Sequence, residues 1–250
     1  MSDALSHALA PYEDAARHLE GSVLDYEPEP LEPGPPWDYE AIAAEACAGA
    51  GVVLDLGTGG GEVLSRLLEG ASCRAVATEC WDRNAPIAAA RLGDRARVVR
   101  TSSLALPFAK ASFDLVLSRH EEIEPSEVGR VLAPGGRFVT QQVVHDVWHE
   151  LRDVFPGFVR YPNHFTAYRR GLEAAGLTVT RAVEFRRRVR FRELGHLVYQ
   201  LAAAPWHLPG FSVATHLNEL SELKRRAGSE GGLILTDGAY LLEAHLPTVP

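Results

Sequence analysis

The segment from Val52 to Val63 constrains the fold of this chain most, because an apolar run breaks into glycines and then resumes with helical spacing. Val52–Leu56 has the length and β-rich composition of a buried strand. A tight turn is predicted from four residues that tolerate positive φ and close backbone approach, namely Gly57, Gly59, Gly60 and Gly61. A helical apolar stripe follows at Val63, Leu64, Leu67 and Leu68. Strand, turn and helix in this order predict a crevice at the helix N-terminus that suits a nucleotide-like ligand.

The spacing of the glycines separates two kinds of ligand. A dinucleotide-binding turn follows the pattern G-x-G-x-x-G, and Glu62 stands where its third glycine is required. The chain instead has Asp55-x-Gly57-x-Gly59-x-Gly61, with an acid at the end of the strand. A carboxylate at this place repels a pyrophosphate but attracts an ammonium group.

This pattern resembles the first motif of class I S-adenosylmethionine-dependent methyltransferases, of the small-molecule type similar to the methyltransferase-11 family. The resemblance implies that the turn packs against the methionyl part of S-adenosylmethionine, with S-adenosylhomocysteine as the product. The cofactor-binding residues that it implies here are Asp55, Gly57, Thr58, Gly59 and Gly61. A glycine turn without a ligand is the alternative for this stretch taken alone.

Glu79 ends the second apolar run, Cys73–Thr78, at the distance from the turn where an acid accepts both hydroxyls of a ribose. Cys80 and Trp81 follow and are expected to cover a face of the adenine, although Trp81 fits an interfacial core equally well. Many relatives carry an acid after the third strand, here Ala96–Arg100, that meets the adenine amino group. This chain has no acid there, so we expect a hydroxyl or carbonyl to accept that bond, from Ser102, Ser103 or Leu104.

Two further motifs extend the resemblance, which covers about residues 52–140. Leu106-Pro107-Phe108 and then Phe113-Asp114-Leu115-Val116 open the fourth strand in many of these enzymes. A Leu-x-Pro-Gly-Gly turn at Leu132–Gly136 precedes the fifth strand. Its glycines have a purely structural explanation, since a compact turn requires positive φ.

The polar residues after the fourth strand are the candidate acceptor side of the site, because ligands of open α/β sheets bind beyond the carboxyl ends of the strands. Ser118 is expected to contact the cofactor. His120 is the candidate base, since an imidazole titrates near neutral pH. Arg119 is expected to hold an anionic substrate group and Glu121 to orient either neighbour. The alternative is a solvated loop in which Arg119 and Glu121 pair with helix residues.

The regions outside this core are less regular. Residues 12–24 form a polar amphipathic segment, and an acidic proline-rich connector follows up to residue 37. Between about residues 185 and 238, before the last strand, lies a long insertion that we expect to cover the substrate. It contains an arginine run over residues 186–192 that alternates like a surface strand, with an anion contact as the second interpretation. Substrate contacts are predicted for Gln141, Gln142, His145 and Trp206.

Together these patterns predict an α/β protein with a Rossmann-like, doubly wound sheet of seven mostly parallel strands. The last strand is expected to be antiparallel and to follow the insertion. Residues 1–37 form an N-terminal cap and connector, and residues 38–250 form a methyltransferase domain with a lid at about 185–238.

Composition limits the partners. A net charge of −8 argues against a broad nucleic-acid surface, and no apolar run reaches the 18 residues of a membrane span. The amino terminus lacks the pattern of a signal peptide, so the cytoplasm is expected. The three cysteines do not have the spacing of a zinc site or a disulfide framework, and no metal is expected. A homodimer stays open.

The predicted reaction is methyl transfer from S-adenosylmethionine to oxygen, nitrogen or carbon of a small molecule held at the carboxyl ends of the fourth and fifth strands. The sequence identifies neither the acceptor nor the need for a general base. Two alternatives stay open. One is methylation of RNA or protein, and the other is a non-catalytic S-adenosylmethionine-binding module.

Overall fold

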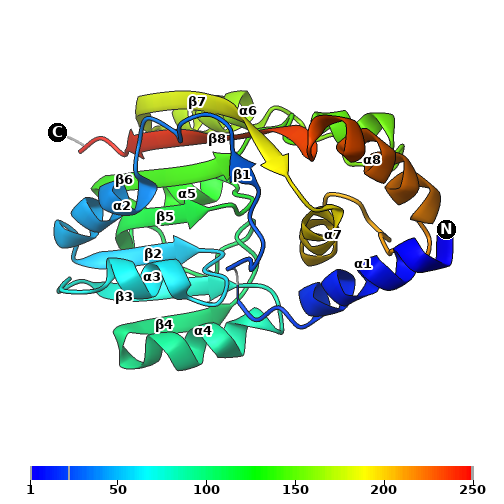
Figure 1. The fold of residues 1–250 in the computed structure, drawn as a ribbon. Coiled ribbons are helices and arrows are strands. Elements are labelled where there is room, and N and C mark those ends of the chain that lie inside the picture. The colour runs from blue at the N-terminus through cyan, green and yellow to red at the C-terminus, as the bar shows by residue number, and fades with distance from the viewer. Residues whose placement is uncertain (1, 22, 249–250) are drawn as a thin grey trace.

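The computed structural model describes residues 2–21 and 23–248, whose strands form one twisted sheet with the order β1-β7-β8-β6-β5-β2-β3-β4 (Figure 1). Five neighbouring strands run parallel, and β8 runs antiparallel to both β6 and β7. The strands are β1 (Glu29–Pro30), β2 (Val52–Leu56), β3 (Arg74–Glu79), β4 (Ala96–Arg100), β5 (Phe113–Arg119), β6 (Leu132–Val143), β7 (Thr178–Phe191) and β8 (Leu233–His245). The α/β class and the antiparallel last strand are confirmed. The two-residue β1 adds an eighth strand that the sequence did not predict.

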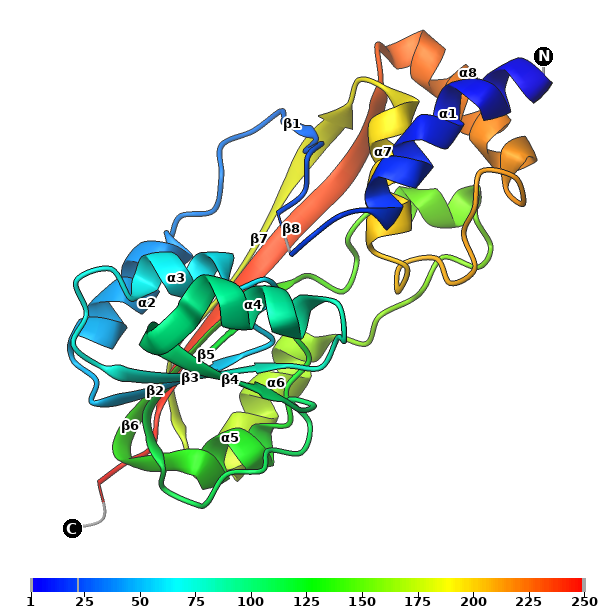
Figure 2. The same cartoon turned by 90° about the horizontal axis from the view of Figure 1, so that it is seen from below.

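Helices cover both faces of the sheet, as Figure 2 shows. One face carries α2 (Tyr39–Ala48), α3 (Glu62–Leu67) and α4 (Asn84–Leu92), and the other carries α5 (Pro125–Val131) and α6 (His164–Ala174). Short 3-10 turns occur at η1 (Gly93–Arg95) and η2 (His149–Asp153). Helix α2 is capped at its N-terminus, because the carboxylate of Asp38 accepts a hydrogen bond from the backbone N–H of Ala41 at 3.1 Å.

The side chains of successive residues in β5 pack on opposite faces of the sheet. Leu115 and Leu117 pack with Ala43 and Cys47 on the α2 side, whereas Val116 belongs to the core on the opposite side. The central strands are therefore buried on both faces, as their near-continuous apolar sequences require. This burial fixes the register, so the carboxyl ends of β2, β3, β5 and β6 come together at one edge of the sheet.

A helical cap stands beyond that edge. It consists of α1 (Ser2–Arg17), α7 (Leu194–Ala203) and α8 (Leu217–Glu230), and the long β7–β8 pair carries α7 and α8 away from the sheet (Figures 1 and 2). These two strands pair from Thr178–His245 to Phe191–Leu233. The outer parts of the predicted insertion are therefore regular strand, and its helical part lies between residues 192 and 232.

The amphipathic segment predicted at residues 12–24 overlaps the second half of helix α1. This helix begins at Ser2, ends at Arg17 and contains Pro11 within it. Leu5, Leu9 and Ala16 are buried on the side of α1 that packs against the other two helices of the cap, α7 and α8. A proline in a helix removes one backbone hydrogen bond, and we attribute the tolerance of Pro11 to the apolar burial on either side of it.

The acidic connector and the arginine run neutralise each other along the edge of β7. Glu29 pairs with Arg192 at 2.8 Å, and Glu32 pairs with Arg188 at 3.1 Å. The other three arginines of the run also pair with acids. Arg186 pairs with Asp146, Arg187 with Asp237 and Arg190 with Glu29. The interpretation of the run as a surface strand is confirmed.

No helix within the described residues is both long and apolar enough to cross a membrane.

Candidate active site

The glycine turn between β2 and α3 satisfies most of its own backbone N–H groups. Gly57, Gly59 and Gly61 have φ values of 64°, 60° and 78°, in the left-handed region that favours glycine. The N–H of Gly57 donates to Thr78 Oγ1 at 3.2 Å, and the N–H of Gly59 donates to Glu79 Oε2 at 2.8 Å. Those of Thr58 and Gly61 donate to backbone carbonyls at 2.9 and 3.0 Å. These groups are thus not free to cradle a phosphate.

Glu79 lies at the carboxyl end of β3, directly beside this turn, and is only 5% exposed. Its second oxygen accepts a hydrogen bond from the N–H of Trp81 at 2.8 Å. The carboxylate therefore ties the glycine turn to the loop after β3. Each carboxylate oxygen has a further lone pair, so the predicted contact with ribose hydroxyls is compatible with these bonds and stays a prediction.

Negative charge accumulates around the turn. Asp55 is 8% exposed, and burial raises its pKa to about 7; the hydroxyl of Thr58 acts against this rise, and the charges of Glu121 and Glu79 add to it. Burial also raises the pKa of Glu121, although the hydroxyl of Ser103 opposes the change. Across the described residues, none of Asp55, Glu79 and Glu121 forms an ion pair with a basic side chain.

This environment fits the methionyl part of S-adenosylmethionine better than a pyrophosphate. A pyrophosphate needs free N–H donors and positive charge, whereas a sulfonium and an ammonium group are stabilised by carboxylates. The residues that would hold the methionyl part are those of the glycine turn with Asp55, and Glu79 would face the ribose.

The last residue of β5 and the first one after it are the candidate acceptor-side residues, Arg119 and His120. His120 has φ 58°, which is uncommon for a residue other than glycine, and its N–H donates to the carbonyl of Gln141 at 2.9 Å. Its ring retains access to solvent although protein surrounds it. Burial, and then the charge of Arg119, lower the pKa of His120 to about 4. His120 is therefore neutral at pH 7 and able to accept a proton.

Arg119 is a half-buried guanidinium without a counter-ion. Its Nε is buried and has no hydrogen-bond partner in the part of the chain that the structure describes, and it forms no ion pair there. Its charge acts on Tyr39 and on Glu40 at the start of α2, but Glu40 is paired with Arg66 at 2.6 Å. The alternative in which Arg119 pairs with a helix residue to hold the loop therefore has no ion pair in its support.

The part of the chain that holds these residues is similar to a known protein family. Residues 53–136 match the family model described as a methyltransferase domain. Within that stretch the chain is similar to a methyltransferase domain. The match spans the glycine turn, Glu79, Arg119 and His120. No curated protein matches this sequence significantly.

Solved structures with the same fold extend over nearly the whole chain. A candidate methyltransferase from Bacillus halodurans C-125 has a TM-score of 0.62 and 17% identity, covering 84% of this chain and 99% of its own. The YcgJ protein from Bacillus subtilis gives 0.62 and 16%, with the same coverage. The [4+2]-cyclase SpnF gives 0.60 and 18%, covering 96% and 93%. At these identities the likeness shows the fold alone, and the cyclase shows that this fold does not by itself decide the reaction.

Two residues predicted to contact ligands have a supporting position in the methyltransferase domain. The buried Gln142 donates from Nε2 to Thr140 Oγ1 at 2.8 Å, to the carbonyl of Glu121 at 2.8 Å and to Ser118 Oγ at 3.1 Å. Ser118 is fully buried. Gln142 and Ser118 thus brace the loop that holds His120 and Glu121, because both face the backbone carbonyl of Glu121. Their predicted contacts with substrate and cofactor stay predictions.

The other predicted substrate residues lie in different surroundings. Gln141 accepts a hydrogen bond at Oε1 from the indole Nε1 of Trp37 at 2.7 Å, a partner that the sequence did not indicate. In the loop after β6, Nδ1 of His145 lies 3.9 Å from Oδ1 of the adjacent Asp146. Substrate contact by Gln141 and His145 stays a prediction.

The cap meets the methyltransferase domain at a pair of exposed indoles. Trp81 is 43% exposed and Trp206 is 50% exposed, and their ring centroids lie 5.6 Å apart in an edge-to-face arrangement. The residue expected to cover the adenine therefore touches the insertion. On the other side, Ser102 accepts a hydrogen bond from the N–H of Leu104 at 3.1 Å, whereas the buried Ser103 lies beside Glu121.

The amino-terminal segment also reaches the glycine turn, which sequence reasoning missed. A Cβ added to Gly60 would lie 2.7 Å from the Cα of Gly21. Gly21 itself has φ 80° and packs against Glu62 at the start of α3. A lone glycine in a polar segment is a weak signal, so this close approach had no recognisable pattern.

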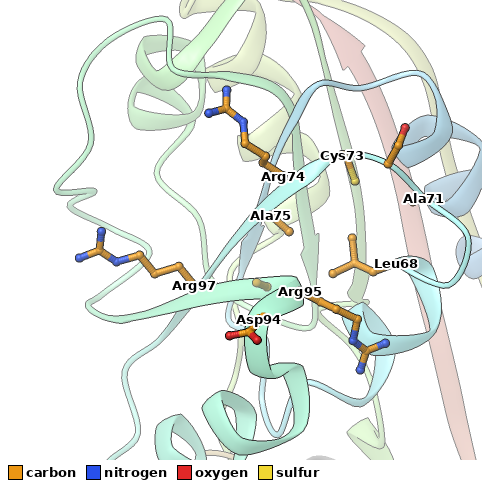
Figure 3. A pocket seen from close by; sticks show the side chains of 10 residues that line it. Leu68, Ala71, Cys73, Arg74, Ala75, Asp94, Arg95 and Arg97 are labelled. Atoms are coloured by element: carbon orange, nitrogen blue, oxygen red, sulfur yellow. The ribbon is translucent and has the colours of Figure 1, made fainter.

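The hollows on the surface lie elsewhere. One of about 390 Å³ is lined by residues near the amino ends of β3 and β4, including Cys73, Arg74 and Arg97 (Figure 3). Another of about 440 Å³ lies beside Gly51 and Gly136. Both are at the amino ends of parallel strands, opposite the edge that holds Glu79 and His120, so neither belongs to the candidate active site.

Proposed function

We propose that this chain transfers the methyl group of S-adenosylmethionine to a small-molecule acceptor held at the carboxyl ends of β5 and β6, below the helical cap. One observation carries the proposal. Next to the glycine turn, Arg119 presents a guanidinium with no counter-ion and His120 presents a neutral, accessible imidazole. An anchor for an anionic group and a proton acceptor thus stand side by side where the acceptor is expected.

Positioning is the larger part of the catalytic task. S-adenosylmethionine, when bound, supplies a methyl group that is already activated on a sulfonium. Holding the acceptor on the line of attack contributes on the order of 7–11 kcal/mol. A general base adds ~10²–10⁴-fold, and His120 with its low pKa of about 4 is a weak base. We therefore expect Arg119 and the bracing by Gln142 to matter at least as much as proton removal by His120.

Charge favours a small molecule over RNA. The arginine run of β7 was the strongest basic feature of the sequence. Its arginines form ion pairs with acids such as Glu29, Glu32 and Asp237, which offset their charge. Binding to a phosphate backbone depends on unpaired Lys and Arg. Arg119, which forms no ion pair within the described part of the chain, suits one anionic group of a small acceptor.

A methyl-transfer assay tests the proposal. The purified protein is incubated with S-adenosylmethionine carrying a labelled methyl group and with a metabolite extract, and labelled products are identified by mass. We expect a labelled small molecule whose formation decreases at least tenfold in Arg119→Ala and less in Arg119→Lys, which keeps the charge but loses the paired geometry. Label in RNA or protein alone would favour the first alternative. Cofactor binding without any labelled product would favour the non-catalytic module.

A further inference from the structure

Three carboxylates meet beside the glycine turn without a basic partner. Asp55 comes from the end of β2, Glu79 from the end of β3, and Glu121 from the loop after β5. Their charges act on one another, and within residues 2–21 and 23–248 none of them forms an ion pair. Glu62, which follows the same turn, differs because it is paired with Arg91 at 2.5 Å. The methionyl side of the pocket is therefore negatively charged.

Glu121 is the member of this group whose side chain lies over the turn. A Cβ added to Gly57 would lie 2.6 Å from Glu121 Oε2, so the carboxylate rests directly above the glycine backbone. Both oxygens of Glu79, in contrast, accept backbone N–H groups, and Asp55 lies beside the hydroxyl of Thr58. Glu121 thus holds its carboxylate against the predicted methionyl-binding turn, with Ser103 as its neighbour.

Within the described residues, the charges that act most on this carboxylate are those of other acids. Burial, and then the charges of Glu79 and Glu122, raise the pKa of Glu121, against the effect of the Ser103 hydroxyl. The charge of Glu121 in turn helps to raise the pKa of Asp55, of Cys80 after β3 and of Tyr168 on α6. A ligand that brings positive charge relieves this repulsion, and a ligand that is neutral at the same place does not.

We propose that Glu121 makes the cofactor pocket selective for positive charge, so that S-adenosylmethionine binds in preference to S-adenosylhomocysteine. This inference rests on the proposed function. The two molecules share adenosine, ammonium and carboxylate groups and differ in the methyl group and in the charge on sulfur. A carboxylate above Gly57 therefore stabilises the sulfonium of the donor and leaves the neutral thioether of the product more weakly held, which favours product release.

Calorimetric titration with three ligands tests this role without an acceptor. S-adenosylmethionine and S-adenosylhomocysteine report the charge on sulfur, and 5′-methylthioadenosine reports the adenosine site without the methionyl ammonium and carboxylate. In Glu121→Gln we expect the preference for S-adenosylmethionine over S-adenosylhomocysteine to decrease about three- to tenfold, with the affinity for 5′-methylthioadenosine nearly unchanged. Glu121→Asp keeps the charge and is expected to retain part of the preference.

The exposed neighbour Glu122 provides the matched control, because Glu122→Gln removes the same charge one residue away and is expected to leave the preference unchanged. An unchanged preference in Glu121→Gln overturns the inference, and so does an equal loss of affinity for all three ligands, which would show a purely structural role. A wild-type protein that bound none of them would overturn the cofactor assignment as well. A wild-type protein that binds but methylates no acceptor refutes the proposed function and still allows the charge preference to be measured.

Discussion

The indole of Trp81 meets the indole of Trp206 edge to face, with ring centroids 5.6 Å apart, although more than 120 residues separate them in the sequence. Trp81 follows the strand that ends in Glu79, and Trp206 lies in the loop after α7. This contact joins the loop after β3, where the adenine is predicted to bind, to the insertion above it. The insertion is therefore held to the same loop as Glu79.

We predict that Trp206→Ala impairs acceptor turnover much more than cofactor affinity. An aromatic pair contributes about 0.5–1.5 kcal/mol, so loss of this contact should weaken cofactor binding no more than about tenfold. Loss of the wall above the acceptor should reduce kcat/KM further. Calorimetry and steady-state kinetics measure the two effects. If both values stay at the wild-type level while Tm decreases, Trp206 belongs only to a small core beneath the insertion.

A second prediction concerns Glu79. Glu79→Gln removes the charge that accepts the N–H groups of Gly59 and Trp81 and is expected to face the ribose. Losing a charged hydrogen-bond partner costs about 1–3 kcal/mol, so we expect the Kd of S-adenosylhomocysteine to rise by about one to two powers of ten. Calorimetry measures this change, with Glu69→Gln at the exposed end of α3 as the control. An unchanged Kd would exclude the ribose contact.

A third prediction follows from the buried carboxyl of Asp55. Its pKa of about 7 in the folded state compares with about 4 for a solvated aspartate in the unfolded chain. Between these values the folded chain holds a proton that the unfolded chain releases, so the free energy of unfolding decreases as the pH rises from about 4 to 7. Asp55→Asn removes this dependence and should stabilise the cofactor-free protein at pH 8 by on the order of 1–4 kcal/mol.

Thermal unfolding without cofactor at pH 5 and pH 8 measures this effect. The advantage of Asp55→Asn in Tm should grow between the two pH values, and the exposed control Asp94→Asn should show no such trend. A lower Tm for Asp55→Asn at pH 8 would mean that the ionised carboxylate stabilises the turn. The same variant is expected to bind S-adenosylmethionine more weakly, because it removes one of the charges around the methionyl group.

Local patterns in the sequence were sufficient for the core of the fold and for the place of Glu79 at the end of a strand. The Val52–Leu56 strand, the glycine turn and Glu79 carry their signals within a few residues. The packing of α1 against α7 within the cap could not be predicted, because the two helices lie far apart in the chain. For the same reason the bracing of Glu121 by Gln142 and the contact of Gly21 with Gly60 were missed, since both depend on tertiary contacts.

The last prediction concerns His120, whose imidazole is neutral because burial and Arg119 lower its pKa to about 4. The base form is lost only as the pH falls through that value, so the acidic limb of the wild-type turnover profile should lie well below the usual histidine value of about 6.5. His120→Ala should reduce kcat by about 10²-fold or more and lose this limb, with cofactor affinity unchanged.

His120→Gly provides the matched control, because it also lacks the imidazole but tolerates the φ of 58°. We expect it to be as inactive as His120→Ala and about 1 kcal/mol more stable. Wild-type turnover in both variants at every pH would eliminate His120 as the base and leave positioning by Arg119 and the loop as the source of catalysis.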